Sequence, residues 1–308
     1  MKFKHLLPLL MVTITSCTQN TFAINRKVFC FDTMVDITLY EGNEEDLGNI
    51  ESICVEYSNF SDNYHAVSGV NNIYTINNTD GEVTVDPKLF KMIKATMEIR
   101  MVAKRFDPFI GSLARKWKEA LAAGTTLSDE VITEEMQKIS GASLFYDNNV
   151  VKLNGDVELD FGGIAKGYTL DIIKDYLNEK EMKHYLINAG SSSILLGEKN
   201  SDDGNFSVGI KDLQNAYLTL KNCVISTSGN TAQGEHIVDP RTGRLANTYD
   251  SVIVISEGGM LGDALSTSMM MCTVSEIQEL ETNNNVRAIA IKNGQIVYKN
   301  SSLEVRYR

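Results

Sequence analysis

The stretch that most constrains this chain is residues 160–168, which read DFGGIAKGY and lie between two different patterns. Before it, residues 157–161 alternate between apolar and polar side chains, as a half-buried strand does. After it, apolar residues recur at four-residue spacing over about residues 164–178, which predicts a helix. We therefore expect a strand, a glycine-rich turn and a helix, an arrangement that favours an anion such as phosphate at the helix N-terminus.

The glycine-rich stretch matches neither of the two common phosphate-binding loops. A Walker A loop requires Lys and then Ser or Thr directly after its last glycine, whereas Tyr168 follows Gly167. A dinucleotide loop reads G-x-G-x-x-G, and the spacing here is G-G-x-x-x-G. Two interpretations stay open at this point: a phosphate site, or a tight turn with Lys166 on the surface.

The composition indicates a globular protein that does not act on nucleic acid. The chain has 308 residues, 43% hydrophobic and 22% charged, which is enough for one large or two small domains with a core of their own. The net charge of −11 argues against nucleic-acid binding, which depends on neutralisation of phosphates by Lys and Arg. Any phosphate would be bound locally, by backbone N–H groups or through a cation.

The N-terminus reads as an export signal. Residues 1–5 (MKFKH) form a basic segment, and residues 6–14 form an apolar segment too short to span a bilayer. Residues 14–17 (ITSC) resemble a bacterial lipobox, so we expect residues 1–16 to be a lipoprotein signal peptide and Cys17 to carry the lipid. The alternative is a plain signal peptide followed by an incidental cysteine. The expectation is an exported lipoprotein, membrane-anchored on the periplasmic or other extracytoplasmic side, with a tether over residues 17–28 and a folded domain over residues 29–308.

The remaining cysteines do not suggest a metal site. Cys30, Cys54, Cys223 and Cys272 are far apart in the sequence and show no C-x-x-C spacing, so zinc is not expected. An oxidising compartment permits disulfides, but no pairing follows from the sequence. Buried free thiols are the default expectation.

The pattern along the chain predicts an α+β fold with a largely antiparallel sheet and packed helices. Helices are expected over residues 44–57, from Pro87 to about residue 102, and over residues 113–123, 164–178 and 263–273, with a further helix opened by a capping box at Ser275 and Gln278. Strands are expected over residues 35–40, 150–153, 157–161, 184–188, 206–210, 217–220, 224–226, 251–256, 288–291 and 295–298. Short strands joined by tight turns favour antiparallel pairing.

Two further groups of residues have the chemistry of a phosphate site. Residues 235–244 (EHIVDPRTGR) form a turn that carries His236 among acidic and basic side chains suited to phosphate placement and proton transfer. On a helix, Asp263 and Thr267 are one turn apart, so their oxygens lie on one face and suit a hard cation such as Mg²⁺. A structural histidine and an N-capping aspartate are the alternatives.

The sequences of these segments, and their order along the chain, resemble those of the ApbE family of FAD:protein FMN transferases. The matching segments are GDVELDFGGIAKGY, LINAG, SVGI, STSGN, HIVDPRTG and DALST, preceded by FDTMVDI, VDPKLF and RFDPFIG. The resemblance covers about residues 29–300. It implies a duplicated α+β arrangement of the T-fold type.

The resemblance implies Mg²⁺-dependent cleavage of FAD and transfer of FMN to a Thr or Ser hydroxyl of an acceptor protein, with release of AMP. The implied acceptor carries an S/T-G-A-S/T-like sequence and is a membrane redox subunit. Residues 140–143 (SGAS) match that sequence as well, but a turn between a helix and a strand is the expectation there.

The resemblance also implies roles for individual residues. The implied FAD contacts are Met34, Phe60, Arg105, Phe106, Asp107, Asp160, Lys166 and Ile237. The implied metal site consists of the Gly163 carbonyl, Asp263, Ser266 and Thr267. His236 occupies the position of the catalytic base or phosphate stabiliser, and Asp263 is the second catalytic residue. Phe60 stands where the family often has a tyrosine. Residues 188–192 and Asn230 depart from the sequence pattern of the family, so no role is assigned to them.

Two other functions remain compatible with the same residues. A Mg²⁺-dependent FAD pyrophosphatase would use water in place of the acceptor hydroxyl. A non-catalytic flavin-binding lipoprotein would need no cation at the pyrophosphate, so Asp263, Thr267 and His236 together favour an enzyme.

Overall fold

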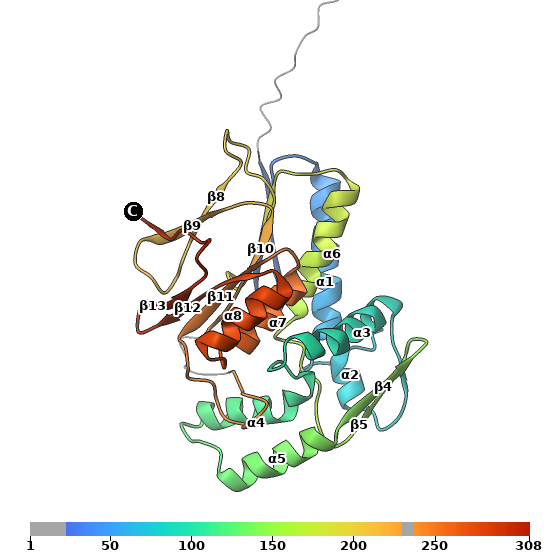
Figure 1. Ribbon diagram of the computed structural model, residues 1–308. Coiled ribbons are helices and arrows are strands. Elements are labelled where there is room, and N and C mark those ends of the chain that lie inside the picture. The colour runs from blue at the N-terminus through green and yellow to red at the C-terminus, as the bar shows by residue number, and fades with distance from the viewer. Residues whose placement is uncertain (1–22, 230–236) are drawn as a thin grey trace, which may run out of the picture.

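A large antiparallel sheet forms the centre of the protein. The computed structural model describes residues 23–229 and 237–308 (Figure 1). Eight strands are hydrogen-bonded in the order β1-β2-β6-β7-β10-β11-β12-β13, and all neighbouring pairs are antiparallel. Their bounds are β1 (Ile24–Cys30), β2 (Thr33–Leu39), β6 (Tyr185–Ala189), β7 (Ser193–Leu196), β10 (Cys223–Gly229), β11 (Ser251–Ser256), β12 (Arg287–Lys292) and β13 (Gln295–Lys299). The predicted α+β class with a largely antiparallel sheet is confirmed, whereas the T-fold duplication stays a prediction.

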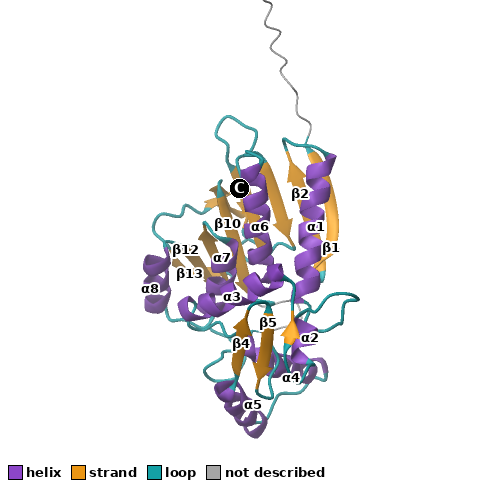
Figure 2. Ribbon diagram, turned by 90° about the vertical axis from the view of Figure 1, so that its right-hand side faces the viewer, coloured by secondary structure: helices purple, strands orange, loops and turns teal. Residues whose placement is uncertain are grey.

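Helices cover one face of this sheet. Helices α1 (Glu44–Ser61) and α6 (Ala165–Glu179) lie side by side (Figure 2), with α1 over β1 and β2 and α6 next to β7. Helices α7 (Gly259–Met269) and α8 (Val274–Asn284) pack over the other half, where Leu265 and Ile277 share a core with Val252 of β11. Each fully buried aliphatic side chain of this kind stabilises the fold by about 1.5–3 kcal/mol.

A three-stranded sheet covers the opposite face, but only over part of the large sheet. Its order is β14-β9-β8, with β8 (Phe206–Gly209), β9 (Ala216–Leu220) and β14 (Arg306–Tyr307). Phe206 and Leu218 pack against Ile225 and Ile253 of the large sheet. Strand β11 is therefore covered on both sides and all of its residues are buried.

A smaller helical region adjoins the sheet and forms the lower part of the molecule in Figure 1. It comprises α2 (Ile73–Asn77), β3 (Val83–Thr84), α3 (Pro87–Val102), the 3-10 helix η1 (Pro108–Ile110), α4 (Gly111–Ala122), α5 (Asp129–Gly141), β4 (Ser143–Asp147) and β5 (Val150–Asn154). The segment 140–143 is the predicted turn between a helix and a strand. No helix within the described residues has the length and apolar character needed to cross a membrane.

Three predicted boundaries are wrong. Strand β1 begins at Ile24, inside the segment predicted as tether, because Val28 and Cys30 alternate into the core beneath α1. Helix α7 begins at Gly259, so Asp263 lies in its second turn and does not cap it. The capping box that opens α8 consists of Thr273 and Glu276, two positions before the predicted pair.

The run before the glycine-rich turn is not a strand, contrary to the prediction. Its backbone bonds to other elements: Leu159 N–H donates to Asn77 Oδ1 at 2.7 Å, and Glu158 C=O accepts from Gly111 N at 3.0 Å. The alternation reflects burial of Val157, Leu159 and Phe161 between helices. Alternation of apolar and polar residues indicates which side chains are buried. It does not supply a neighbouring strand, and residues 157–161 pair with none of the described strands.

The four cysteines of the described chain are buried free thiols, as predicted. Cys30 and Cys54 face each other between β1 and α1, whereas Cys223 and Cys272 lie in separate cores. Burial raises the pKa of the Cys272 thiol, which favours its protonated form.

Candidate functional site

One cavity of about 1250 Å³ collects most of the residues that the sequence singled out. Its wall combines the glycine-rich turn, the segment before η1, Thr267 of α7 and Ile237. Strands β6, β7, β10 and β11 of the large sheet, strands β8 and β9 of the small sheet and the loops at residues 190–192 and 210–215 form most of the rest. Segments more than 150 residues apart in the chain, such as Arg105 and Thr267, thus meet at one site.

The glycine-rich turn is held in place by Asp160. Its Oδ1 accepts a hydrogen bond from Gly162 N at 2.6 Å, and its own N–H donates to Pro108 O at 2.8 Å. Burial raises the pKa of this carboxyl group, and the Gly162 N–H and Arg115 act against that shift. Asp160, Gly162, Gly163 and Lys166 all line the cavity, so the turn presents backbone, ammonium and carboxyl groups to any ligand there.

Asp263 is the central buried carboxylate behind this wall. Its Oδ2 accepts from Gly167 N at 2.6 Å, and its Oδ1 accepts from the hydroxyls of Ser226 at 2.6 Å and Ser193 at 2.9 Å. Burial raises the pKa of Asp263, while Lys166 and the three donors oppose that effect. The carboxylate therefore joins α6, β7 and β10 to α7 at the edge of the cavity.

Helices α6 and α7 approach closely because both carry glycine at their crossing. A methyl group added to Gly167 would lie 2.2 Å from Gly259 O. Asp171 of α6 accepts hydrogen bonds from Gly259 N at 2.5 Å and Met260 N at 2.8 Å, so it caps the N-terminus of α7. This contact sets the position of α7 and of the residues it presents.

The predicted metal ligands provide only oxygen atoms. Thr267 Oγ1 and Ser266 Oγ hydrogen-bond to Ser228 Oγ at 3.1 and 2.8 Å, and a methyl group added at Gly163 would lie 3.4 Å from Thr267 Oγ1. The described chain contains no group of three or more His, Cys, Asp or Glu side chains suited to a metal.

This donor set fits Mg²⁺ better than a softer metal. Mg²⁺ is commonly held by one or two carboxylates together with oxygens of the substrate phosphates. A carboxylate has about four acceptor positions, and Asp263 uses three of them, which leaves one for a cation. Ser266 Oγ also donates to Asp263 O at 3.0 Å and is buried, so it supports the neighbouring ligands within α7.

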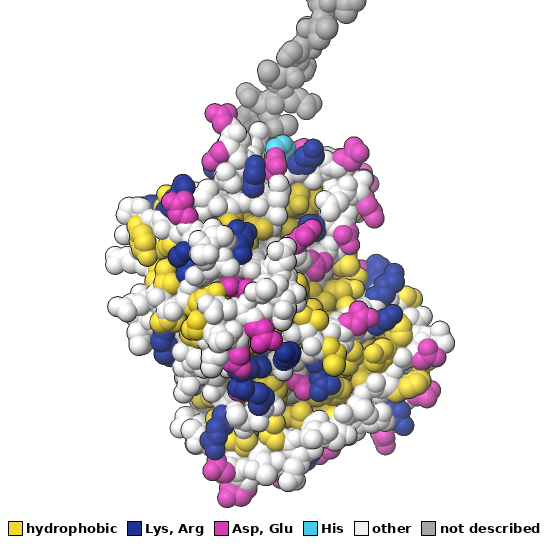
Figure 3. Space-filling view, in the orientation of Figure 1, with side chains coloured by type: hydrophobic (Ala, Val, Ile, Leu, Met, Phe, Trp, Pro, Cys, Tyr) yellow, Lys and Arg dark blue, Asp and Glu magenta, His cyan; other side chains and the backbone are white. Residues whose placement is uncertain are grey.

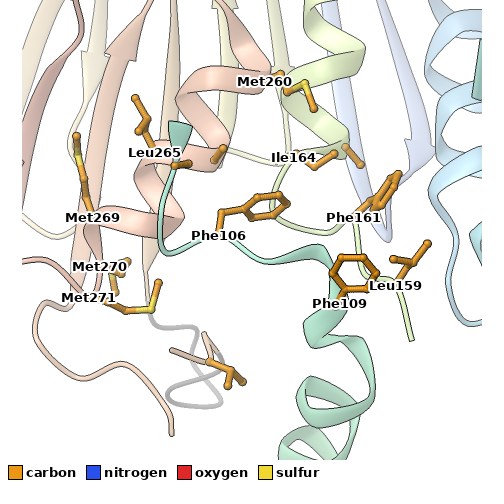
Figure 4. Packing of buried hydrophobic residues seen from close by; sticks show 14 of the residues in the cluster. Phe106, Phe109, Leu159, Phe161, Ile164, Met260, Leu265, Met269, Met270 and Met271 are labelled. Atoms are coloured by element: carbon orange, nitrogen blue, oxygen red, sulfur yellow. The ribbon is translucent and has the colours of Figure 1, made fainter. Parts of the chain in front are cut away.

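The predicted flavin contacts before η1 line the cavity and are held by ion pairs. Phe106 lies between the glycine-rich turn and Leu265 of α7 (Figure 4), and a methyl group at Gly163 would be 3.2 Å from its ring. Arg105 pairs with Glu276 of α8, and Asp107 pairs with Arg100 at 2.7 Å. Their orientation in the cavity wall is therefore set before any ligand binds.

The other residues predicted for the site do not all lie at the cavity. Ile237 lines the cavity, but His236 and Cys17 lie outside the described residues. Met34 is 43% exposed on β2 and its carbonyl accepts from Gly190 N at 3.2 Å beside the cavity. Phe60 does not line the cavity: its ring is buried in the core, edge-on to Tyr57.

Several residues of the site received no role from the sequence. Ser193, Ser226 and Ser228 bond to Asp263, Ser266 or Thr267, and Asp171 caps α7. The serines belong to the short runs SSS and STS, whose polar side chains within apolar strands were a usable signal. Asp171 gave no signal, because an acidic residue on an amphipathic helix is ordinary.

The chain carries 29 Lys and Arg residues and 40 Asp and Glu residues. Acidic and basic side chains are interspersed over the face seen in Figure 3, with apolar groups between them.

The family model and the relatives that match this chain all point to the same protein family. The family model described as "ApbE family" matches residues 31–290. A protein of Klebsiella pneumoniae named FAD:protein FMN transferase is 27% identical over 257 residues, which are 76% of this chain and 79% of that protein. A protein of Rhodobacter capsulatus with the same name is 26% identical over 67% of this chain and 42% of its own length.

Solved structures show the same fold. The flavin transferase ApbE of Vibrio cholerae superposes with a TM-score of 0.75 at 19% identity, over 91% of this chain and 98% of that chain. The ApbE protein of Thermotoga maritima superposes with a TM-score of 0.75 at 22% identity, with the same coverage.

Proposed function

Because this chain belongs to the ApbE family, we propose that it is an FAD:protein FMN transferase that moves FMN from FAD to a Thr or Ser hydroxyl of an acceptor protein and releases AMP. Relatives from Klebsiella pneumoniae and Rhodobacter capsulatus are named FAD:protein FMN transferase. The observation that carries the proposal is the meeting of Arg105, Phe106, Asp160, Lys166 and Thr267 around one cavity.

Phosphoryl transfer depends mainly on positioning and charge neutralisation, and the site provides both. Lys166 would bind pyrophosphate oxygens, and Asp160 would hold the glycine-rich turn against the ligand. Phe106 would pack against the flavin, since it is the aromatic side chain in the wall beside Gly163.

Mg²⁺ would be held by Asp263, Thr267 and the Gly163 carbonyl, and would offset charge on the pyrophosphate. The three donors to Asp263 keep this buried carboxylate in one orientation. His236 would take the proton from the acceptor hydroxyl; its neighbour Ile237 lines the cavity, which supports that role.

The test is a reaction of the purified chain with FAD, Mg²⁺ and a peptide that carries an S/T-G-A-S/T sequence. Covalent flavin fluorescence on the peptide together with AMP is the expected result. FMN and AMP without a labelled peptide would instead make the protein an FAD pyrophosphatase. Unchanged FAD that stays bound would make it a flavin carrier, and His236→Ala gives the matched test of the proposed base.

We also propose that the protein is an exported lipoprotein attached to a membrane through Cys17. The basic segment 1–5, the apolar residues 6–14 and the ITSC sequence support this. Cys17→Ser should remove the lipid mass from the mature chain and move the protein from the membrane fraction to the soluble fraction. An unchanged mass and location in that variant would contradict the proposal. The acceptor is then expected to be a membrane redox subunit that faces the same compartment.

A further inference from the structure

Strand β8 is an edge strand whose backbone forms part of the cavity wall. It lies at the end of the order β14-β9-β8, so only one of its sides is paired. Residues 207–210 line the cavity without interruption. Because Gly209 has no side chain, the atoms with which it lines the cavity are backbone atoms.

The outward-facing backbone groups on this edge can be assigned. Ile210 N–H donates to Ala216 O at 2.9 Å, and the register continues with Val208 opposite Leu218. Hydrogen-bonded pairs alternate in an antiparallel ladder, so Ser207 and Gly209 direct their N–H and C=O groups away from β9. Both residues are exposed, and no hydrogen bond from another described residue reaches these backbone groups.

The floor of the cavity opposite β8 continues onto an uncovered part of the large sheet. Leu186 and Ile194 line the cavity and are only partly buried. On the same face, the cross-strand pair Phe29 and Met34 is 70% and 43% exposed, so the small sheet leaves this pair uncovered. An unpaired strand edge therefore borders a partly apolar floor.

This combination fits an extended polypeptide better than a second small molecule. Small-molecule pockets usually measure about 300–1,000 Å³, and this cavity of about 1250 Å³ is larger. A dinucleotide has no regular row of amide groups to match Ser207 and Gly209, whereas a peptide in strand conformation has one. Side chains that alternate along such a peptide would rest on Leu186 and Ile194 on one side and face solvent on the other.

We propose that the acceptor protein docks here by adding an extended segment as a strand next to β8, with its hydroxyl-bearing residue directed toward the glycine-rich turn. This inference rests on the proposed transferase function, because it takes the acceptor of that reaction as the occupant. It names the element that recognises the acceptor backbone, which is separate from the residues that would bind FAD.

The first test follows amide hydrogen exchange at Ser207 and Gly209 in the whole chain, alone, with FAD, and with the S/T-G-A-S/T peptide without FAD. We expect fast exchange in the free protein and with FAD, and slower exchange with the peptide. Slow exchange in the free protein would mean that this chain or a second copy covers the edge, and protection by FAD alone would assign the groove to FAD. Either result overturns the proposal.

The second test compares two variants at the same position. Gly209→Pro removes the outward N–H, whereas Gly209→Ala keeps it and places a methyl group where no atom lies within 4 Å. Loss of one such hydrogen bond should raise the peptide KM about tenfold in Gly209→Pro, with Gly209→Ala and FAD affinity unchanged. Equal peptide KM values in the two variants would overturn the proposal.

A third measurement leaves the protein unaltered, in case Gly209→Pro does not fold. Peptides N-methylated at one backbone position each should lose affinity at alternate positions, since only every second amide of an added strand faces β8. Uniform losses or none would overturn the strand geometry. Slower amide exchange at Ser207 and Gly209 without flavin labelling of the peptide would support docking at β8 and reject the transferase function. Labelling of the peptide without slower exchange would support the transferase function and reject docking at β8.

Discussion

Asp263 Oδ2 accepts a hydrogen bond of 2.6 Å from the backbone N–H of Gly167, a residue 96 positions earlier in the chain. This bond connects the helix that follows the glycine-rich turn to the helix that presents Thr267. The same carboxylate accepts from Ser193 and Ser226 in two strands of the large sheet. The buried carboxylate that is proposed to bind a cation thus also determines how the walls of the cavity fit together.

Asp263→Asn should abolish Mg²⁺-dependent transfer while the chain still folds. The amide keeps the shape of the side chain but removes the negative charge, and loss of such a charge typically costs about 100-fold or more in rate. The measurement is AMP release as a function of Mg²⁺ concentration. Turnover within a few fold of the unaltered chain would contradict the metal assignment.

A matched control for that experiment is Asp171→Asn. This residue is also an aspartate whose pKa is raised by burial, but its carboxylate caps α7 and it is not one of the predicted metal ligands. We expect lower stability with a response to Mg²⁺ concentration like that of the unaltered chain. The two variants together separate the loss of a ligand from the loss of a helix cap.

Gly167→Ala should destabilise the protein by about 1–3 kcal/mol, the usual cost of forcing extra volume into a packed region. The added methyl group would meet Gly259 O at 2.2 Å, so α6 and α7 would have to separate. Urea denaturation measures the change in the free energy of unfolding. Gly141→Ala is the control, because nothing lies within 4 Å of its added methyl group; an equal loss in both variants would show that the crossing is not the cause.

Ser226→Ala should reduce the transfer rate about 10- to 100-fold, as is typical when a group that orients a metal ligand is lost. The hydroxyl donates to Asp263 Oδ1 at 2.6 Å and is fully buried. The rate at saturating FAD and the Mg²⁺ dependence are the quantities to measure. Ser52→Ala on the exposed side of α1 serves as control and should leave both unchanged.

Glu276→Gln should lower stability at pH 7 by about 1 kcal/mol, and this effect should shrink as the pH falls through the lowered pKa of Glu276. Hydrogen bonds from Thr273 at the start of α8, together with Arg105, lower the pKa of Glu276. A carboxyl group with a lowered folded-state pKa contributes stability above its unfolded value of about 4.3, and loses it as the pH falls through the folded value. The side chain is 41% exposed, so solvent screening limits the gain.

The measurement for this prediction is the free energy of unfolding as a function of pH for both chains. Glu279→Gln is the control, because Glu279 is an exposed residue that lies 3.5 Å from Lys104. A pH-independent difference between Glu276→Gln and the unaltered chain would show that packing of Glu276, and not its charge, stabilises α8.

Much of the fold could be predicted from the sequence, because apolar residues recur at a different spacing in a helix than in a strand. Strand β11 was predicted with its observed bounds, and α1, α3 and α6 within a few residues. The errors occur where a partner distant in the sequence decides the outcome. Residues 157–161 alternate like a strand, yet Asn77 and Gly111 take up the backbone hydrogen bonds of Leu159 and Glu158.

The sequence by itself determined the family and the α+β class. It also identified residues that line the cavity beside the glycine-rich turn, because short sequence motifs contain that information locally. Only the tertiary structure decided that Phe60 belongs to the core, that three donors hold Asp263, and that the edge of β8 borders the cavity. The physical reason is that burial and hydrogen-bond partnership are properties of pairs of segments. A side chain's own chemistry and spacing do not specify which distant group will desolvate it or donate to it.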